Sequence, residues 1–414
     1  MTQRLLPFFL LLLGTAFPTL AQTPGPPRFL VEEILVEGTR RDAVREIVAA
    51  ESLLRPGREY SEQELREAVY RVKRLPFVVD AEHSLRPGGE QGRYQLVITI
   101  EETHLVFYSI DYAGFYDGDD RNVQPGEDRV SWGGSATAGG RWFLGSQGLL
   151  FGSVLGFEDE GPVSAQAGYT RYNLFGHGGF GSIALSANLD EDRGDAYQVS
   201  FSMGLPIVGN HSLRADLAWG EAKDEFFETS FRREERRLGL AWIYDTTDDP
   251  LFPTSGTRVT GDAGYSREED EFDRSSFFPD AKTSFDSWSL GLVGRRHWAL
   301  THRQSVSTEA GASWSESDDS GDFGTFEQWT TGVALGHSMD LWGFEKTERF
   351  GDFRWENRVD VFRNHFDSIF SSGTSIDGRL TTSLVFRNAW GLIRVSFIYV
   401  DNLQRDFRTE QEFP

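Results

Sequence analysis

The chain has few residues whose types and spacing suit covalent chemistry. It contains no cysteine, which excludes disulfides, a thiol nucleophile and a thiolate metal site. The segment GHSMD at Gly336 to Asp340 has part of the pattern of a nucleophile elbow, but it lacks the second glycine and the strand-to-helix context. The eight histidines do not have the spacing of metal ligands. We therefore expect no enzymatic activity, no metal and no cofactor.

Charge and hydropathy limit the kinds of partner. The formal net charge is -23, which argues against nucleic acid as a partner because phosphate contacts need clustered lysine and arginine. The mean hydropathy is -0.41, so membrane-spanning helices are excluded for the bulk of the chain, because each needs about 20 consecutive apolar residues. The high aromatic content of 14% and the 44 glycines therefore need another explanation.

The first 28 residues have the pattern of an export segment. A basic start at Arg4 precedes an apolar stretch from Leu5 to Leu13, and small residues follow as far as Ala21. This pattern predicts a secretory signal peptide over residues 1–21, cleaved after Ala21, and the alternative is a membrane anchor. The proline-rich TPGPP then predicts a linker over residues 22–28.

Residues 29–102 alternate between strand and helix patterns. The strand-like FLVEEILVEG comes first, Asp42 is placed to cap a first helix, and Ser61 with Glu64 forms a capping box for a second. FVVDAEHSL and YQLVITIEE then predict two strands joined by a PGGEQG turn. The expected unit is a small α+β domain in the order β-α-α-β-β. An exposed sheet edge can accept an extended peptide as an added strand, and a packed spacer that binds nothing is the alternative.

From residue 104 to residue 414 the helical period is replaced by strict alternation, as in GSIALSANL, YQVSFSMGL and SLRADLAW. The connections also alternate, because short turns such as WFLGSQG and NLFGHGG interleave with acidic segments such as FEDEGP and LDEDRGDA. A soluble sandwich has no reason to sort its turns in this way. The pattern predicts an all-β transmembrane barrel of about 16 antiparallel strands, each crossing the apolar layer with roughly 10 residues. Trp132, Trp142, Trp219 and Trp242 are expected in its interfacial girdles.

Several segments resemble a known family. VEEILVEGTRR, RPGREYSEQEL and VITIEE resemble a single POTRA domain, and the alternating unit resembles the barrels of the BamA/TamA superfamily, also called bacterial surface antigen proteins. DPLFPTSGTRV is similar to the most recognisable periplasmic turn of that family. Proline forbids strand continuation and glycine permits the turn. The residues of this turn motif are Asp249, Phe252, Pro253, Thr254 and Gly256.

The family also carries an Arg-Gly-Phe or Arg-Gly-Tyr signature on a long loop that folds back into the barrel. Leu341, Trp342, Gly343 and Phe344 align with this signature, and Trp342 replaces the arginine. In the family that arginine contacts acidic residues on the lumen wall, which tryptophan cannot do. Two nearby arginines and two nearby carboxylates are candidates for a substitute lumen contact: Arg349, Arg354, Glu356 and Asp360.

The C-terminus departs from the family pattern. WGLIRVSFIYVDN is a good strand, but the charged QRDFRTEQEFP follows it, and Phe413 is penultimate rather than final. A closing strand of this kind predicts a barrel seam that is loose or built differently.

The resemblance implies a protein of the bacterial outer membrane, with its POTRA domain in the periplasm. The implied function is assembly and insertion of outer-membrane proteins, or polypeptide translocation. The expected partners are outer-membrane lipid and lipopolysaccharide, unfolded outer-membrane or exported polypeptides, and periplasmic chaperones or lipoproteins. The alternatives are a divergent pore or structural barrel without insertase activity and a two-partner-type secretion porin.

Overall fold

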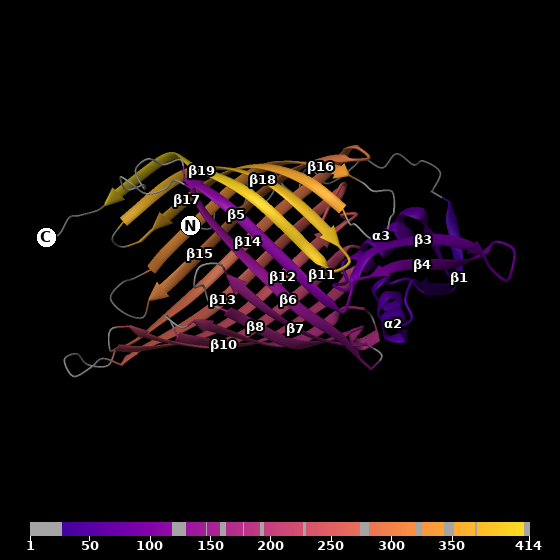
Figure 1. Cartoon of the computed structure of the whole chain (residues 1–414), viewed down its shortest axis with the longest axis horizontal. Helices are drawn as coiled ribbons and strands as arrows, with labels where there is room; N and C mark the ends of the chain where they lie inside the picture. Colours follow the sequence, from indigo (N-terminus) through magenta and orange to yellow (C-terminus); the bar gives the residue numbers. More distant parts are fainter. Residues whose placement is uncertain are drawn as a thin grey trace.

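The structure is a computed structural model in which a long barrel carries a small α+β unit at one end (Figure 1). We call residues 27–102 the N-terminal unit, the barrel end that it contacts the near mouth, and the opposite end the far mouth. The structure describes residues 27–117, 130–145, 147–157, 163–176, 178–190, 194–226, 229–273, 281–319, 325–342, 352–368 and 371–409. The expected signal peptide and most of the expected linker lie outside these residues.

The N-terminal unit contains a four-stranded sheet and two helices. Its sheet has the order β2-β1-β4-β3, in which β1 and β4 are parallel and the other neighbours are antiparallel. The short strand β2 lies between the helices and was missed by the sequence, because four residues are too few to show an alternation. The elements are β1 (Arg28–Glu37), α2 (Asp42–Glu51), β2 (Arg58–Ser61), α3 (Glu62–Lys73), β3 (Val78–Pro87) and β4 (Arg93–Glu102).

The two helix starts differ from each other. The capping box of α3 is confirmed, since the Glu64 backbone N–H donates to Ser61 Oγ at 3.3 Å and the Ser61 N–H donates to a Glu64 carboxylate oxygen at 2.6 Å. The cap expected at Asp42 is wrong, because Arg41 occupies the N-cap position, and its side chain makes no capping hydrogen bond. Asp42 is instead the first helical residue, where its charge favours the helix dipole and pairs with Arg45 at 2.7 Å.

Strands β5 to β19 form a closed barrel, with fifteen strands in the described part of the chain. Neighbours are antiparallel, except that β19 closes the barrel by pairing in parallel with β5. The expectation of about 16 strands, all antiparallel, is therefore corrected: an odd number of alternating strands leaves the first and the last running in the same direction. Strands β5 to β12 are β5 (Val106–Asp117), β6 (Val130–Leu144), β7 (Gly148–Phe157), β8 (Val163–Tyr172), β9 (Phe180–Asp190), β10 (Gly194–Val208), β11 (His211–Phe226) and β12 (Thr229–Asp245). Strands β13 to β19 are β13 (Gly256–Asp273), β14 (Ala281–Thr301), β15 (Gln304–Asp319), β16 (Thr325–Trp342), β17 (Asp352–Asp367), β18 (Ser371–Asn388) and β19 (Gly391–Thr409).

Many strands are longer than the roughly 10 residues that cross the apolar layer. β14 has 21 residues, and its pairing with β13 continues as far as Phe272 opposite Ala281. The acidic segment SREEDEF, residues 266–272, is thus part of a strand. Opposite charges across neighbouring strands stabilise such extensions, as where Arg233 meets Glu268 at 2.8 Å.

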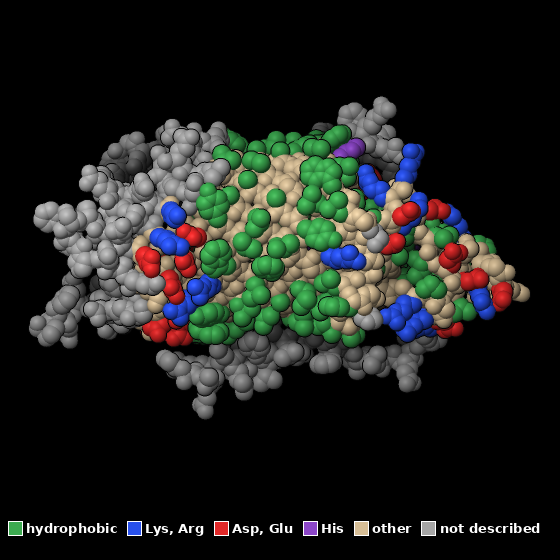
Figure 2. Space-filling model, turned by 90° about the horizontal axis from the view of Figure 1, so that it is seen from below, with side chains coloured by type: hydrophobic (Ala, Val, Ile, Leu, Met, Phe, Trp, Pro, Cys, Tyr) green, Lys and Arg blue, Asp and Glu red, His purple; other side chains and the backbone are tan. Residues whose placement is uncertain are grey.

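The outside of the barrel wall is apolar and the inside is polar. Leu290, Val359 and Leu384 are each about half exposed on the outer face, whereas Arg354 and Asp360 point inward and are buried. Apolar side chains cover the middle of the wall, and charged side chains gather toward its two ends (Figure 2). This arrangement suits a barrel whose outer face contacts lipid. Among the described residues, no helix has the length and apolar character needed to cross a membrane.

Aromatic side chains mark the height of the apolar band. Trp288 and Trp298 both project outward from β14, about ten residues apart. At about 3.3 Å per residue and a tilt of about 40°, they are separated by roughly 25 Å along the barrel axis, the height of a lipid-facing band. The four tryptophans that the sequence assigned to girdles are all exposed on the wall: Trp132, Trp142, Trp219 and Trp242.

A charge placed in the middle of this band tests the lipid-facing assignment. Leu335 lies on the outer face of β16 and is 63% exposed. We expect Leu335→Arg to lower the free energy of unfolding by about 2–4 kcal/mol, because a cation near the bilayer midplane loses its hydration. Denaturant unfolding of the bilayer-inserted protein, followed by tryptophan fluorescence, measures this loss. Leu335→Ala is the control, and an equal loss in both variants would contradict a lipid-facing position.

Candidate functional site at the near mouth

The N-terminal unit is joined to the barrel by a shared apolar core. Phe77 is 2% exposed and packs edge-to-face against Phe143 of β6 at 5.1 Å and Tyr172 of β8 at 5.9 Å between ring centroids. Leu149 of β7 belongs to the same buried cluster as the helices of the unit. Because this core continues from the unit into the barrel wall, the unit is held at one side of the near mouth.

Two arginines at the end of α3 bind turns of the barrel. Arg71 donates to Asn210 Oδ1 in the β10–β11 turn at 3.3 Å. Arg74 donates to the carboxylate of Asp245 at 2.9 Å and to the Thr247 carbonyl at 3.1 Å, at the point where β12 ends. The unit is therefore connected by charge-assisted hydrogen bonds to the base of the β12–β13 turn.

A partly exposed glutamate also lies at this joint. Glu51, the last residue of α2, accepts a hydrogen bond from the backbone N–H of Gly179 in the β8–β9 turn and faces Arg71 and Arg74. Burial raises the pKa of its carboxyl to about 7, against the opposing effect of the two arginines. Tyr172 of β8 lies nearby. The joint thus contains a carboxyl that changes charge near neutral pH.

This carboxyl gives the joint a defined pH dependence. The pKa of Glu51 in the folded protein lies above 4.5, the ordinary value of a glutamate carboxyl. The folded protein therefore binds the Glu51 proton more tightly than the unfolded chain does. The stability that protonated Glu51 contributes to the folded protein is therefore fully present below pH 4.5 and is lost as the pH rises through about 7. We expect the melting temperature of the helices, followed by circular dichroism, to fall across this interval. In Glu51→Gln this fall should disappear, and an unchanged pH profile would show that Glu51 is not responsible.

The β12–β13 turn, residues 246–255, is shaped by its own side chains. Asp248 accepts from the backbone N–H groups of Thr254 at 2.8 Å and Ser255 at 3.0 Å, and it also accepts from the Thr254 hydroxyl. Asp249 accepts from the Phe252 N–H at 2.7 Å. Gly256 has a φ of +106°, and a Cβ there would clash with the Thr246 carbonyl oxygen. The conformation of the turn is therefore fixed by bonds within the turn and does not depend on contacts with the opposite wall.

The same turn extends across the near mouth to the opposite wall. Phe252 is 5% exposed, and two guanidinium groups contact its ring, with Arg354 of β17 at 4.7 Å and Arg387 of β18 at 4.5 Å from the centroid. Both carboxylate oxygens of Asp249 accept from Arg387 at 3.1 Å. Pro253 contributes its carbonyl to a 3.4 Å bond from Ser305 of β15. Three strands separate β13 from β17 in the barrel order, so the turn spans part of the lumen opening.

The electrostatics of this contact favour the ionised forms. Burial alone would raise the pKa of Asp249, but the Arg387 guanidinium and the N–H groups of Phe252 and Leu251 outweigh it and hold the pKa below its ordinary value. Arg387 also pairs with Asp352 at 2.9 Å, and Arg354 pairs with Asp340 at 2.8 Å. Each arginine is thus oriented by a carboxylate of the wall as well as by the turn.

The turn motif named from the sequence is therefore brought into one site. Asp249, Phe252 and Pro253 contact the opposite wall, while Thr254 and Gly256 shape the turn. Sequence reasoning missed three further residues of the site: Asp248, Asp340 and Arg387. Asp248 was detectable as an aspartate placed to accept from following N–H groups.

The lumen-loop signature is not brought into this site by the described residues. Leu341 and Trp342 are the last residues of β16, not part of a loop. Leu341 lines a shallow hollow with Trp355 and Leu384, whose side chains project from the outer face of the wall. Gly343 and Phe344 lie outside the described residues.

The four predicted lumen-contact residues have different outcomes. Arg354 pairs with Asp340 rather than with Glu356 or Asp360. Asp360 is paired, but with Arg358 at 2.7 Å and Arg379 at 3.3 Å. Arg349 lies outside the part of the chain that the structure describes.

A row of ion pairs crosses the inner wall. Arg358 of β17 reaches Glu309 of β15 at 2.9 Å, and Glu309 also pairs with Arg295 of β14. Gly336 of β16 lies opposite Ser307 on one side and Arg358 on the other, and a Cβ there would clash with the Ser307 hydroxyl. The inner wall is thus polar and ionised, as in a water-accessible lumen.

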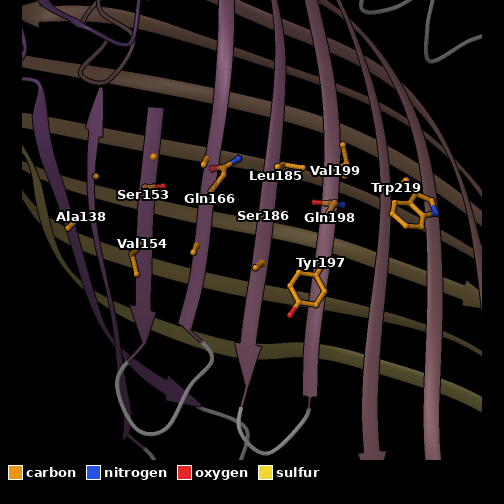
Figure 3. Close-up of a pocket in the computed structure, with 15 residues that line it drawn as sticks. Ala138, Ser153, Val154, Gln166, Leu185, Ser186, Tyr197, Gln198, Val199 and Trp219 are labelled. Atoms are coloured by element: carbon orange, nitrogen blue, oxygen red, sulfur yellow. The ribbon is translucent and has the colours of Figure 1, made fainter. Parts of the chain in front are cut away.

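A larger hollow lies in the wall formed by β6 to β11, with a volume of about 650 Å³ (Figure 3). Its lining is made mostly of small side chains, such as Ala138, Ser153 and Ser186, with Tyr197 and Trp219 among the larger ones. None of the residues that line it is charged. The hollow therefore offers a ligand neutral polar and apolar contacts.

No protein-family model matches the chain, and no curated protein matches it either. Among solved structures, BamA from Haemophilus ducreyi lacking POTRA domains 1-3 has 13% sequence identity and a TM-score of 0.41, covering 92% of this chain and 84% of that chain. CdiB from Acinetobacter baumannii has 9% identity and a TM-score of 0.41, covering 87% of this chain and 68% of that chain. OmpT, an outer membrane protein of Vibrio cholerae, has 9% identity and a TM-score of 0.32, covering 74% of this chain and 95% of that chain. The chain, a closed barrel with a small α+β unit at one mouth, is thus similar to these structures at low sequence identity.

Proposed function

We propose that this chain is an outer-membrane factor that assembles and inserts barrel proteins or translocates polypeptides. In this proposal the N-terminal unit acts as a POTRA domain in the periplasm and receives unfolded chains. The observation that carries the proposal is the place of the unit: its core continues into β6, β7 and β8, so a bound chain is held beside the near mouth.

The sheet of the N-terminal unit supports a binding role. Strand β3 pairs with β4 on one side, and no described strand pairs with its other edge. An unpaired edge presents backbone donors and acceptors to which an extended polypeptide can add as a further strand. Unfolded polypeptide is therefore the proposed substrate, and lipid with lipopolysaccharide is the proposed surrounding of the apolar band. Periplasmic chaperones or lipoproteins are proposed as further partners.

Site-specific photocrosslinking tests this function in cells that produce the full chain. A photoreactive residue at Ser84, exposed on β3, should capture unfolded outer-membrane or exported polypeptides. The same probe at Gln63, exposed on α3, is the matched control and should capture few. Depletion of the protein should lower the amounts of other folded outer-membrane barrels. Equal capture at both positions, together with unchanged barrel levels, would remove the proposal.

A secretion or pore function is the second candidate, and the polar inner wall favours it. The row of pairs that includes Glu309, Arg358 and Asp360 lines a lumen that water and polar chains can enter. Under this alternative, depletion leaves other barrels at normal levels and instead changes solute permeability or the export of one dedicated polypeptide.

A further inference from the structure

The contact between the β12–β13 turn and the opposite wall resembles a ligand bound in a site, with the turn as the ligand and the wall as the site. The turn supplies an aromatic ring and a carboxylate three residues before it, Phe252 and Asp249. The wall supplies two guanidinium groups that both contact the ring, and one of them also binds the carboxylate. Guanidinium groups suit both partners, because they stack on aromatic faces and form paired hydrogen bonds with carboxylates.

The wall half of this contact does not depend on the turn for its shape. Arg354 is 5% exposed and is held by Asp340 of the neighbouring strand, and Arg387 is held by Asp352. The Nε atom of Arg387 is buried and has no hydrogen-bond partner among the described residues, so a donor remains for a ligand. Two oriented arginines would therefore persist if the turn moved away.

The turn half is likewise independent of the wall. Asp248 and Gly256 fix its conformation through bonds and backbone geometry within residues 246–256. Its base is gripped by Arg74 of the N-terminal unit, through Asp245 and Thr247. The two halves thus meet as a preformed peptide and a preformed receptor, and the N-terminal unit is attached to the peptide half.

We propose that Arg354 and Arg387 form a lumenal binding site for polypeptide segments in which a carboxylate closely precedes an aromatic residue. The β12–β13 turn occupies this site until such a segment displaces it, and the occupied state closes part of the near mouth. That the segment belongs to a polypeptide in transit rests on the proposed function. The site itself rests on the contacts of Asp249 and Phe252 alone.

Peptide binding to the full chain in lipid bilayers tests the site. The probe is the chain's own segment as a free, fluorescently labelled peptide, acetyl-DPLFPTSG-amide. In Asp249→Asn/Phe252→Ala the site is emptied, and we expect the probe to bind at least tenfold more tightly than to the unaltered protein. The further change Arg354→Gln/Arg387→Gln should abolish this binding. A control peptide with serine in place of phenylalanine should bind at least tenfold more weakly. Equal binding of the probe to the emptied and the arginine-free variants would overturn the proposal.

Bilayer conductance gives a second, independent readout. Because the chain has no cysteine, Thr254→Cys/Ser305→Cys contains a unique thiol pair near the Pro253–Ser305 contact. Crosslinking this pair with a short bifunctional thiol reagent should hold the turn in place, whereas Asp249→Asn/Phe252→Ala should raise the conductance and the probe peptide should lower it again. A conductance that ignores both the crosslink and the peptide would contradict the site. Neither measurement requires assembly activity, so failure of the proposed function alone would leave both results unchanged.

Discussion

Replacing Phe77 by alanine should lower the free energy of unfolding of the N-terminal unit by about 3–5 kcal/mol, the usual cost of removing a fully buried aromatic side chain. Phe77 is 2% exposed and stands between the unit and the barrel wall. Its loss removes the edge-to-face contacts with Phe143 and Tyr172, each worth about 0.5–1.5 kcal/mol beyond buried area. The effect should therefore reach the joint as well as the unit.

Limited proteolysis of the bilayer-inserted protein measures this second effect. In Phe77→Ala we expect cleavage to release the N-terminal unit while the barrel stays protected. Phe29→Ala is the matched control, because Phe29 packs against Tyr94 within the unit and has no described contact with the barrel. It should destabilise the unit and leave the joint in place. Release of the unit to the same extent in both variants would show that Phe77 has no special part in docking.

Removing Arg387 should cost about 3 kcal/mol in barrel stability, the lower end of the range for breaking one partner of a buried ion pair. The lower end applies because the side chains of Arg387 and Asp249 keep 14% and 16% exposure. Arg387→Ala leaves Asp249 and Asp352 without their shared cation and removes one of the two guanidinium contacts of the Phe252 ring. Its effect should therefore exceed that of Asp249→Asn.

A double-mutant cycle separates the pair from its surroundings. Unfolding of Asp249→Asn, Arg387→Ala and the double variant should give a coupling energy of about 0.5–3 kcal/mol, as expected for residues in direct contact. Arg86→Ala is the control, since the pair between Arg86 and Glu37 is exposed on the surface of the N-terminal unit and should contribute little. Additive losses across the cycle would show that the turn is not held by this ion pair.

Local sequence patterns predicted the helices and strands, but they did not predict the contacts between residues far apart in the chain. The capping box at Ser61 depends on residues three apart, and the alternation in the barrel depends on residues two apart. The contact between Asp249 and Arg387 joins residues 138 apart, and no periodicity relates them. The motif around Phe252 marked a turn correctly, yet whether a turn points into solvent or across a lumen depends on the opposite wall.

Closure of the barrel was difficult to predict for a similar reason. Strand number follows from where pairing ends, and pairing in β13 and β14 continues through charged residues that resemble a loop. The parallel seam follows from that count, since β5 and β19 both begin at the near mouth. The prediction of a seam that is loose or built differently rested on the charged C-terminus, whereas the parallel pairing follows from the odd number of strands.

Closure through a parallel seam is best tested by a cysteine pair across β5 and β19. Ala113 lies opposite Ser396 in this register, within the about 4.4–6.8 Å between Cα atoms that a disulfide spans. In the bilayer-inserted protein, Ala113→Cys/Ser396→Cys should oxidise readily, whereas Ser109→Cys/Ser396→Cys, whose positions are displaced along the strand, should not. Rapid oxidation of the displaced pair, or of neither pair, would contradict the closed fifteen-strand barrel.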